Sequence, residues 1–467
     1  MADYQTLATI IGFRGINADY IEELLPPEDE PTYIVDGNNI LIKNGKIEKL
    51  KGTDYLNSIS TQLGIEGYRN VLGIPIYEKY DKTKTLMAVT PRKLYRLVSD
   101  TTWTATGDIS AGENASIFSG ANIEDKFIFC LSDSGYIYKW DGTTFGKLFS
   151  SPDDENRKAR LLLEFKTYLV LLRTIESTVE QYQRFWPSNP GNITLFDDED
   201  KLDLDIESPI LNAKQLQDAI MVYFARGIRA VYWGGDDVRW VEQSVPGAPD
   251  IYAPKTLCGD ESVHFFLSKK GLMRTLAGDI PRSISDRKFN KFILDSIDPV
   301  HYPKAVAYFY PHLNMLYMSY PKSGSTDNDV QIIYDTVANE LVSKKELTED
   351  KHAGYGEFEK DLSGLSEDER KQYGMSIIPI FGNNDGRVKE QKINEYQDCA
   401  VKYNSNINFP FGFFKAPSNN KRVMQADLLI EKLTDQDVNF VLDIIFWYLV
   451  SCFIVFGINF LKSRKQD

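Results

Sequence analysis

Short apolar runs recur along almost the whole chain, and within them apolar and polar residues tend to alternate with a period of two. This period is typical of β-strands, whereas an amphipathic helix repeats every 3.6 residues. Turn-forming Gly, Asp and Asn residues separate the runs. The strongest strand candidates are 85–89, 93–97, 126–131, 136–140, 168–172, 219–224, 263–267, 315–320 and 330–334. The pattern predicts an all-β protein built from antiparallel strands.

The first residues differ from this β texture. An apolar, glycine-containing start is followed by Pro26, Pro27 and Pro31, which forbid a helix or a central strand there. Strand signals then begin at residue 32, and Asn44-Gly45 is a two-residue hairpin signal. We therefore divide the chain into an N-terminal arm, 1–30, and a β body, 31–430.

The body contains a weak internal repeat. An aromatic or apolar pair beside a basic residue precedes a polar turn and another aromatic residue, and the markers Tyr95, Tyr138, Trp186 and Trp233 lie 43, 48 and 47 residues apart. Four-stranded propeller blades recur every 40–50 residues or so. Three further units are marked by 271–274, 333–335 and 386–389. The spacing predicts a β-propeller-like body of six or seven blades with loop insertions, although stacked β-sandwiches would contain similar strands.

Two segments depart from the repeat. Residues 344–373 are polar and charged, which predicts a loop insertion with a short helix beginning at Ser366. The C-terminal segment, 431–467, contains the apolar stretch 444–461, followed by a basic tail. This stretch is long enough to be a membrane-span candidate, and packing against another subunit would favour the same composition. Ile454 and Phe456 are the candidate membrane or assembly contacts.

Charge and composition narrow the function. Lys and Arg number 53 against 67 Asp and Glu, so the net charge is −14 and the pI is about 5.0. This balance argues against a surface built to coat nucleic acid. The densest acidic run could bind a cation, but it lacks the glycine and terminal glutamate of an EF-hand loop, so a solvated loop is expected. Its members are Asp197, Asp198, Glu199, Asp200, Asp203 and Asp205.

Candidate catalytic and cofactor motifs are weak. The glycine-containing segment 142–147 is too short for a phosphate-binding P-loop, and no GxSxG elbow occurs. The chain also starts without the pattern of a secretory signal. We predict no cofactor, no metal site and no enzymatic activity. The cysteines are expected to be buried free thiols and the histidines structural or surface residues, and these are Cys130, Cys258, Cys399, Cys452, His264, His301, His312 and His352.

The start of the body carries a recognisable order of short motifs. A glycine-containing apolar arm, 12–17, precedes an Asn-led strand with a Gly turn, 39–47, and then a basic residue before Gly, 49–53. In this order the chain resembles the propeller-bearing nozzle or hub proteins that close the tail tube of short-tailed bacteriophages. The likeness covers about residues 8–340. Later similar text is found at 233–242, 271–272, 284–285, 320–321 and 333–335. The chain departs from the family in having Lys51 where arginine is usual, and in its apolar end.

The resemblance implies a structural virion protein of the phage tail. Its subunits would form a homo-oligomeric ring, expected to be hexameric, that contacts adaptor and fibre proteins. DNA would pass through this ejection conduit without sequence-specific binding, and the acidic run Asp197–Asp205 would line it, because acidic side chains repel phosphates. The arm would dock onto a neighbouring subunit. Two alternatives stay open: a propeller that binds or hydrolyses host glycans, and a cellular propeller that serves as an interaction scaffold.

Overall fold

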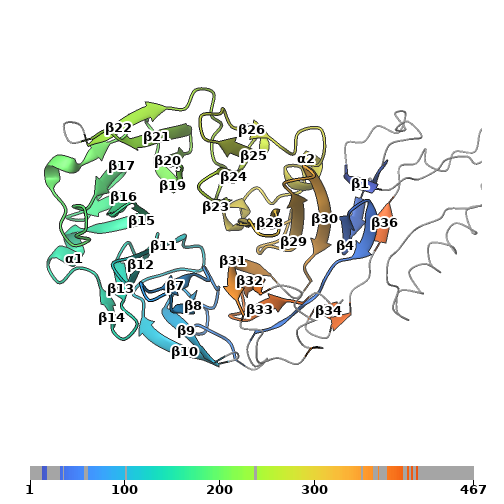
Figure 1. Cartoon of the computed structure of the whole chain (residues 1–467), viewed down its shortest axis with the longest axis horizontal. Coiled ribbons are helices and arrows are strands. Elements are labelled where there is room, and N and C mark those ends of the chain that lie inside the picture. Colours follow the sequence, from blue (N-terminus) through green and yellow to red (C-terminus); the bar gives the residue numbers. More distant parts are fainter. Residues whose placement is uncertain are drawn as a thin grey trace, which may run out of the picture.

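The structure is a ring of β-sheets arranged like blades around a common axis (Figure 1). Six sheets have four strands each in chain order, and a seventh combines strands from both ends of the body. This computed structural model describes residues 13–17, 32–34, 36–56, 61–99, 102–235, 239–348, 351–360, 367, 376–392, 397–398, 401–402 and 406–408. The fold is a seven-bladed β-propeller, so the all-β prediction is confirmed and the stacked-sandwich alternative is excluded.

The blades are numbered along the chain, and each begins with its innermost strand. Blades 1 to 3 contain β7 (Ile76–Glu78), β8 (Lys84–Val89), β9 (Lys93–Ser99) and β10 (Thr102–Asp108); β11 (Phe118–Ile123), β12 (Lys126–Leu131), β13 (Ile137–Trp140) and β14 (Phe145–Lys147); and β15 (Lys158–Phe165), β16 (Tyr168–Glu176), β17 (Val179–Pro187) and β18 (Leu202–Asp203). Blades 4 and 5 contain β19 (Ile210–Leu216), β20 (Ala219–Phe224), β21 (Gly227–Trp233) and β22 (Trp240–Ser244); and β23 (Ala253–Gly259), β24 (Val263–Ser268), β25 (Gly271–Leu276) and β26 (Arg282–Ser283).

The last two blades follow the same meander, except that blade 7 is completed from the N-terminal side. They contain β27 (Val306–Tyr310), β28 (Met315–Tyr320), β29 (Val330–Asp335) and β30 (Glu340–Glu346); and β31 (His352–Glu359), β32 (Ile377–Asn383), β33 (Val388–Gln391) and β6 (Thr53–Tyr55). Short helical segments lie in the connections, namely α1 (Asp153–Asn156), η1 (Asp198–Asp200), α2 (Asn290–Ile293) and η2 (Tyr302–Lys304).

The second strand of each blade explains why the blades pack into a ring. In β12, Phe127 and Phe129 belong to the core shared with blade 1, whereas Ile128 and Cys130 belong to the core shared with blade 3. Successive side chains of a strand point to opposite faces, so a strand that is apolar throughout needs a neighbour on both sides. The same division occurs in β16, whose residues alternate between the cores on its two sides.

Strand β6 closes the ring. It pairs antiparallel with β33, and Tyr55 lies opposite Lys389. The amide of Leu56 continues the ladder by donating to the Val388 carbonyl at 3.0 Å. On the inner side, Gly356 lets blade 7 approach blade 1, because a Cβ there would lie 2.5 Å from the carbonyl oxygen of Ile74. A strand from the start of the chain therefore completes the last blade.

The repeat markers occupy equivalent places in the ring. Tyr95, Tyr138, Trp186 and Trp233 lie on the third strands of blades 1 to 4, namely β9, β13, β17 and β21. The later markers lie on or lead into β25, β29 and β33, the third strands of blades 5 to 7. The repeat is therefore real, and the number of blades is seven.

A small β layer covers the outer strand of blade 6 (Figure 1). It contains β1 (Phe13–Ile16) paired with β2 (Thr32–Ile34), β3 (Asp36–Asn38) paired with β36 (Asn406–Asn408), and the hairpin β4 (Ile40–Lys43) and β5 (Lys46–Lys49). Gly15 permits the approach of β1, because a Cβ there would lie 3.0 Å from Cβ of Glu340 on β30. Two further short strands, β34 (Gln397–Asp398) and β35 (Val401–Lys402), extend the sheet of blade 7.

Glu340 anchors this outer layer. Its buried side chain accepts a hydrogen bond from the Tyr33 hydroxyl at 2.9 Å, and it forms ion pairs with Arg14 at 3.7 Å and Lys288 at 3.4 Å. Tyr33 and Arg14 belong to the outer layer, whereas Lys288 lies on the connection from blade 5 to blade 6. The Glu340 carboxylate therefore ties the layer to the propeller. A buried charge is stable only with such compensation.

One expectation needs correction. The polar segment 344–373 is not an insertion throughout, because its start belongs to β30 and 352–359 forms the innermost strand β31 of blade 7. Residues 13–16 of the arm pack on blade 6 of their own chain, and docking of the arm on a neighbouring subunit stays a prediction. Ser366 and the whole segment 431–467 lie outside the described residues.

Replacing Leu56 with alanine should lower the free energy of unfolding by about 2–5 kcal/mol. The Leu56 side chain is 2 % exposed in the core between blades 7 and 1, so the change leaves a cavity at the closure. The matched change Leu276→Ala, at a side chain that is 38 % exposed, should cost less than about 1 kcal/mol. Denaturant unfolding measures both, and equal losses would contradict a tightly packed closure.

Candidate functional site

A cavity of about 410 Å³ lies on the axis of the propeller. Innermost strands of several blades contribute its wall, because these strands surround the axis. Its charged and polar lining residues include Asn212, Lys255, Tyr308 and Glu357. The volume falls within the range of about 300–1,000 Å³ found for small-molecule sites. This axial cavity is the candidate site.

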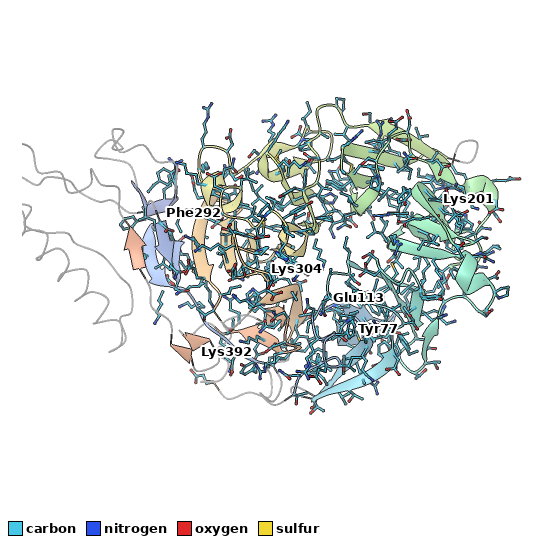
Figure 2. All side chains as sticks on the ribbon, turned by 180° about the vertical axis from the view of Figure 1, so that it is seen from behind. Tyr77, Glu113, Lys201, Phe292, Lys304 and Lys392 are labelled. Carbon is cyan, nitrogen blue, oxygen red and sulfur yellow. The ribbon has the colours of Figure 1, made fainter. Side chains whose placement is uncertain are left out.

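One end of the cavity is a polar mouth formed by loops. Asn70, Asn114 and Lys304 lie on connections that lead into innermost strands, whereas Asp327 and Asn328 lie on the connection between β28 and β29. In an antiparallel meander these two kinds of connection emerge at the same end of the blades. The sequence therefore places polar groups from distant segments around one opening. Figure 2 shows Lys304 at the inner side of the ring.

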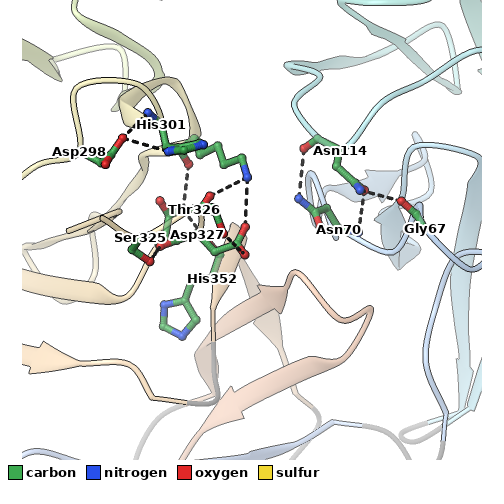
Figure 3. A network of polar contacts seen from close by, with 11 residues as sticks. Gly67, Asn70, Asn114, Asp298, His301, Ser325, Thr326, Asp327 and His352 are labelled. Atoms are coloured by element: carbon green, nitrogen blue, oxygen red, sulfur yellow. Dashed lines mark hydrogen bonds and ion pairs between the residues drawn. The ribbon is translucent and has the colours of Figure 1, made fainter. Parts of the chain in front are cut away.

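Hydrogen bonds fix the mouth on both sides of the axis (Figure 3). The Lys304 ammonium donates to the Thr326 carbonyl at 2.6 Å and to Asp327 Oδ1 at 3.2 Å. Across the opening, the Asn70 side-chain amide donates to the Asn114 carbonyl at 3.1 Å. The charge of Lys304 is thus compensated by Asp327.

Asp298 holds the two loops of blade 6 together. Its carboxylate accepts backbone N–H bonds from Val300 at 2.9 Å, His301 at 2.8 Å and Gly324 at 3.0 Å. These bonds, with that of His301 the strongest, hold the pKa of Asp298 well below its ordinary value. The carboxylate stays charged and locks the approach to β27 against the loop after β28.

A β-bulge aims Lys255 at the axis. The register between β23 and β24 shifts between Ala253 and Cys258, and Pro254 within this stretch offers no N–H to the ladder. The Thr256 hydroxyl compensates, because it donates to the Ala253 carbonyl at 2.6 Å and accepts the Leu267 amide at 2.9 Å. The bulge therefore places Lys255 in the lining of both the axial cavity and the polar mouth.

Lys255 carries an uncompensated charge. It takes part in no hydrogen bond or ion pair with any described residue. Burial lowers the pKa of its ammonium to about 8, the carboxylate of Asp133 opposes that shift, and the charge of Lys304 adds to it. At neutral pH the group is still protonated, so a cation without a hydrogen-bond or ion-pair partner in the described residues faces the cavity.

Glu357 lies on the other part of the cavity wall, toward the end of β31. Burial raises the pKa of its carboxyl, and the charges of His312 and Lys84 oppose the shift. His312 Nδ1 lies 3.7 Å from Glu357 Oε2, which is too long for a hydrogen bond. This oxygen is buried and accepts no hydrogen bond from the described part of the chain.

The histidines and cysteines that the structure describes have structural surroundings. His264 Nε2 donates to the Gln215 carbonyl at 2.8 Å, so Nδ1 accepts the Tyr223 hydroxyl at 2.9 Å, and burial lowers the pKa of this neutral ring to about 4. His352 is buried and stacks on Phe381, with ring centroids 5.0 Å apart. Cys130 and Cys258 are buried free thiols, as expected, whereas Cys399 and Cys452 lie outside the described residues.

The acidic run lies on the outer rim of blade 3, away from the axial cavity. Asp198, Glu199 and Asp200 form η1, and Asp203 ends the outermost strand β18. Figure 2 shows neighbouring Lys201 at the periphery of the ring. Basic side chains contact three of the six carboxylates, in the pairs Asp198–Lys201, Asp200–Arg239 and Asp203–Arg184. In the described structure the carboxylates of Asp197, Glu199 and Asp205 have no cationic partner, although the Arg229 guanidinium donates to the backbone carbonyl of Asp205.

Ile454 and Phe456, together with the stretch 444–461, lie outside the described residues. Within the residues that are described, no helix has the length and apolarity needed to span a membrane. No group of three or more His, Cys, Asp or Glu side chains suitable for a metal ion occurs there either.

Sequence reasoning missed the axial cavity. Its residues come from separate blades, and no short motif connects Lys255 with Glu357 or Asn70. One local signal was present: Pro254 within an otherwise strand-like run indicates a bulge, and bulges often redirect a side chain next to a site.

Known proteins resemble this chain only remotely, among those that the comparisons found. No protein-family model matches the chain, and no curated protein matches it. Similar solved structures include the WD40 β-propeller domain of Doa1 (10 % identity, 74 % of this chain and 98 % of that chain, TM-score 0.44), streptogramin B lyase (10 %, 74 % and 96 %, 0.43) and the computationally designed Ika8 protein (12 %, 83 % and 100 %, 0.41). Likeness this remote concerns architecture alone and carries no argument about function.

Replacing Lys255 with methionine should stabilise the protein at pH 7 by about 1–3 kcal/mol, because it removes a partly buried and unpaired charge. The folded pKa of about 8 lies below the ordinary 10.5, so the unfolded chain binds more protons between these values. The penalty is complete below the folded pKa and disappears as the pH rises to the unfolded one.

Denaturant unfolding across this pH range measures the difference between the two proteins. The gain from Lys255→Met should shrink steadily above about pH 8. Lys82→Met serves as the control, because the Lys82 side chain is 82 % exposed on blade 1. A gain that is absent at pH 7, or that does not change with pH, would contradict the assigned burial of the charge.

Proposed function

We propose that this protein is a structural subunit of the tail nozzle or hub of a short-tailed bacteriophage. It would reside in the virion tail, where subunits form a homo-oligomeric ring, hexameric by family resemblance, next to adaptor and fibre proteins. One observation carries the proposal. The motifs on which the resemblance rests, although they are spread from residue 12 to residue 335, meet largely in a single core.

This shared core joins the outer layer to blades 5 and 6. The N-terminal motifs contribute buried side chains to it, and so do the later segments of the resemblance. The members that come from these motifs are Phe13, Ile16, Ile40, Leu41, Ile42, Ile47, Leu50, Leu272, Ile284, Tyr320, Ile333 and Tyr334. A pattern of short motifs that packs as one unit is better support for kinship than scattered matches. It favours an outer layer that belongs to the architecture of the propeller rather than an added arm.

Opposite edges of the propeller differ in structure and charge, which suits a subunit that contacts its neighbours in a ring. The outer layer lies beyond blade 6, and the acidic rim lies on blade 3 at the other side of the propeller (Figure 1). The axial cavity has room for a metabolite and not for a duplex, so DNA would pass between subunits around the ring axis. In this arrangement the acidic rim would face the conduit. Carboxylates without a basic partner in the described residues, such as those of Asp197 and Glu199, would repel the DNA phosphates there and keep the duplex from binding.

Electron microscopy of phage particles tests the proposal directly. Gold-labelled antibodies raised against the purified full chain should mark the distal end of the tail, and quantitative mass spectrometry of the particles should give about six copies, as a hexameric ring requires. Antibody pre-absorbed with the purified chain is the control.

Label on the capsid, or absence of the chain from purified particles, would overturn the proposal. A host-attachment protein would behave differently, because the isolated chain would then bind host cells and compete with phage adsorption. The nozzle proposal predicts neither effect.

A further inference from the structure

We propose that the axial cavity binds a small, elongated molecule with an oxyanion at one end and a hydrogen-bond donor at the other. Lys255 binds the oxyanion, a carboxylate or a phosphate. Glu357 accepts a hydrogen bond from the other end, an amine or a hydroxyl. This site goes beyond the role of a nozzle subunit and does not depend on it. Two charged groups at separate places on one cavity wall carry the inference, because neither side chain has a hydrogen-bond partner in the part of the chain that the structure describes.

The cationic end depends on Lys255 being available. The nearby Lys304 is already compensated by Asp327, at 3.2 Å, so it does not compete for a ligand. Lys255 has no such partner among the described residues, although the bulge in β23 holds it at the cavity wall. An ammonium at a partly buried wall is stabilised by an oxyanion more strongly than it would be in water. The mouth therefore favours the negative end of a ligand.

The other end offers an acceptor. Glu357 lines the cavity with a side chain that is 30 % exposed, and His312 Nδ1 lies 3.7 Å from its Oε2, beyond hydrogen-bond distance. A carboxylate that faces a partly enclosed cavity is stabilised by a ligand that donates a hydrogen bond to it. An amine suits this place best, because it adds charge attraction to the hydrogen bond.

The separation of the two ends sets the length of the ligand. Ala353 lines the mouth together with Lys255, and Glu357 lies four residues farther along β31. At about 3.3 Å per residue, Ala353 and Glu357 lie roughly 13 Å apart along the strand, which sets the upper scale of the ligand. The wall also contains the apolar side chains of Leu72, Ile74 and Val306. A short apolar chain with a hydrogen bond at each end spans a similar distance.

Calorimetric titration of the full chain with 6-aminohexanoate tests this site, and hexanoate serves as the matched probe that lacks the donor. The wild-type protein should bind 6-aminohexanoate at least about tenfold more tightly than hexanoate, because only the former reaches Glu357. Lys255→Met should weaken both ligands by about tenfold or more. Glu357→Gln should weaken only 6-aminohexanoate and so reduce the ratio between the two.

The control variant is Lys82→Met, which removes an equal charge from an exposed turn of blade 1 and should leave both affinities unchanged. Equilibrium unfolding of each variant separates loss of binding from loss of fold. The site is refuted if wild-type protein binds neither probe at about 10 mM, or if Lys255→Met binds both as well as wild type does. An unchanged ratio in Glu357→Gln would refute the two-ended ligand.

Discussion

The structure depends on one constraint: the second strand of each blade is apolar on both faces, so every blade needs a neighbour on each side. An open row of seven blades would leave an uncovered face at each end, and these faces would be large apolar surfaces in water. A closed ring covers all of them. The three residues of β6 complete blade 7, and Leu56 then fills the core between blade 7 and blade 1.

Closure also creates the candidate site. The innermost strands all run in the same direction along the axis. Their N-terminal ends therefore lie at one end of the propeller, together with the loops that join second to third strands, and these segments form one polar opening. Each blade contributes only one or two groups, yet Asp298 and Lys304 are fixed by hydrogen bonds within blade 6. The stability of the ring can support an unfavourable group at the axis. Lys255 is such a group, since burial lowers its pKa and the carboxylate of Asp133 opposes that shift only in part.

The sequence predicts the interior of each blade better than its edges. Second strands such as β12 and β20 are continuous apolar runs, and the predicted bounds match the observed ones. Outermost strands such as β18 and β26 have two residues each and no periodicity to detect. The closing role of β6 and the site at Lys255 could not be predicted, because both arise from contacts between segments far apart in the chain. The repeat of aromatic markers did predict the blades, since the third strands occupy equivalent positions.

Native-state hydrogen exchange tests the closure most directly. The Leu56 amide donates to the Val388 carbonyl at 3.0 Å, and this bond exists only while β6 is paired with blade 7. If closure holds the ring together, this amide should exchange with the same opening free energy as the amides of β20, deep in blade 4, because both require global unfolding. Exchange at Leu56 that is orders of magnitude faster, while β20 stays protected, would show that β6 detaches from an otherwise intact propeller and would contradict the account.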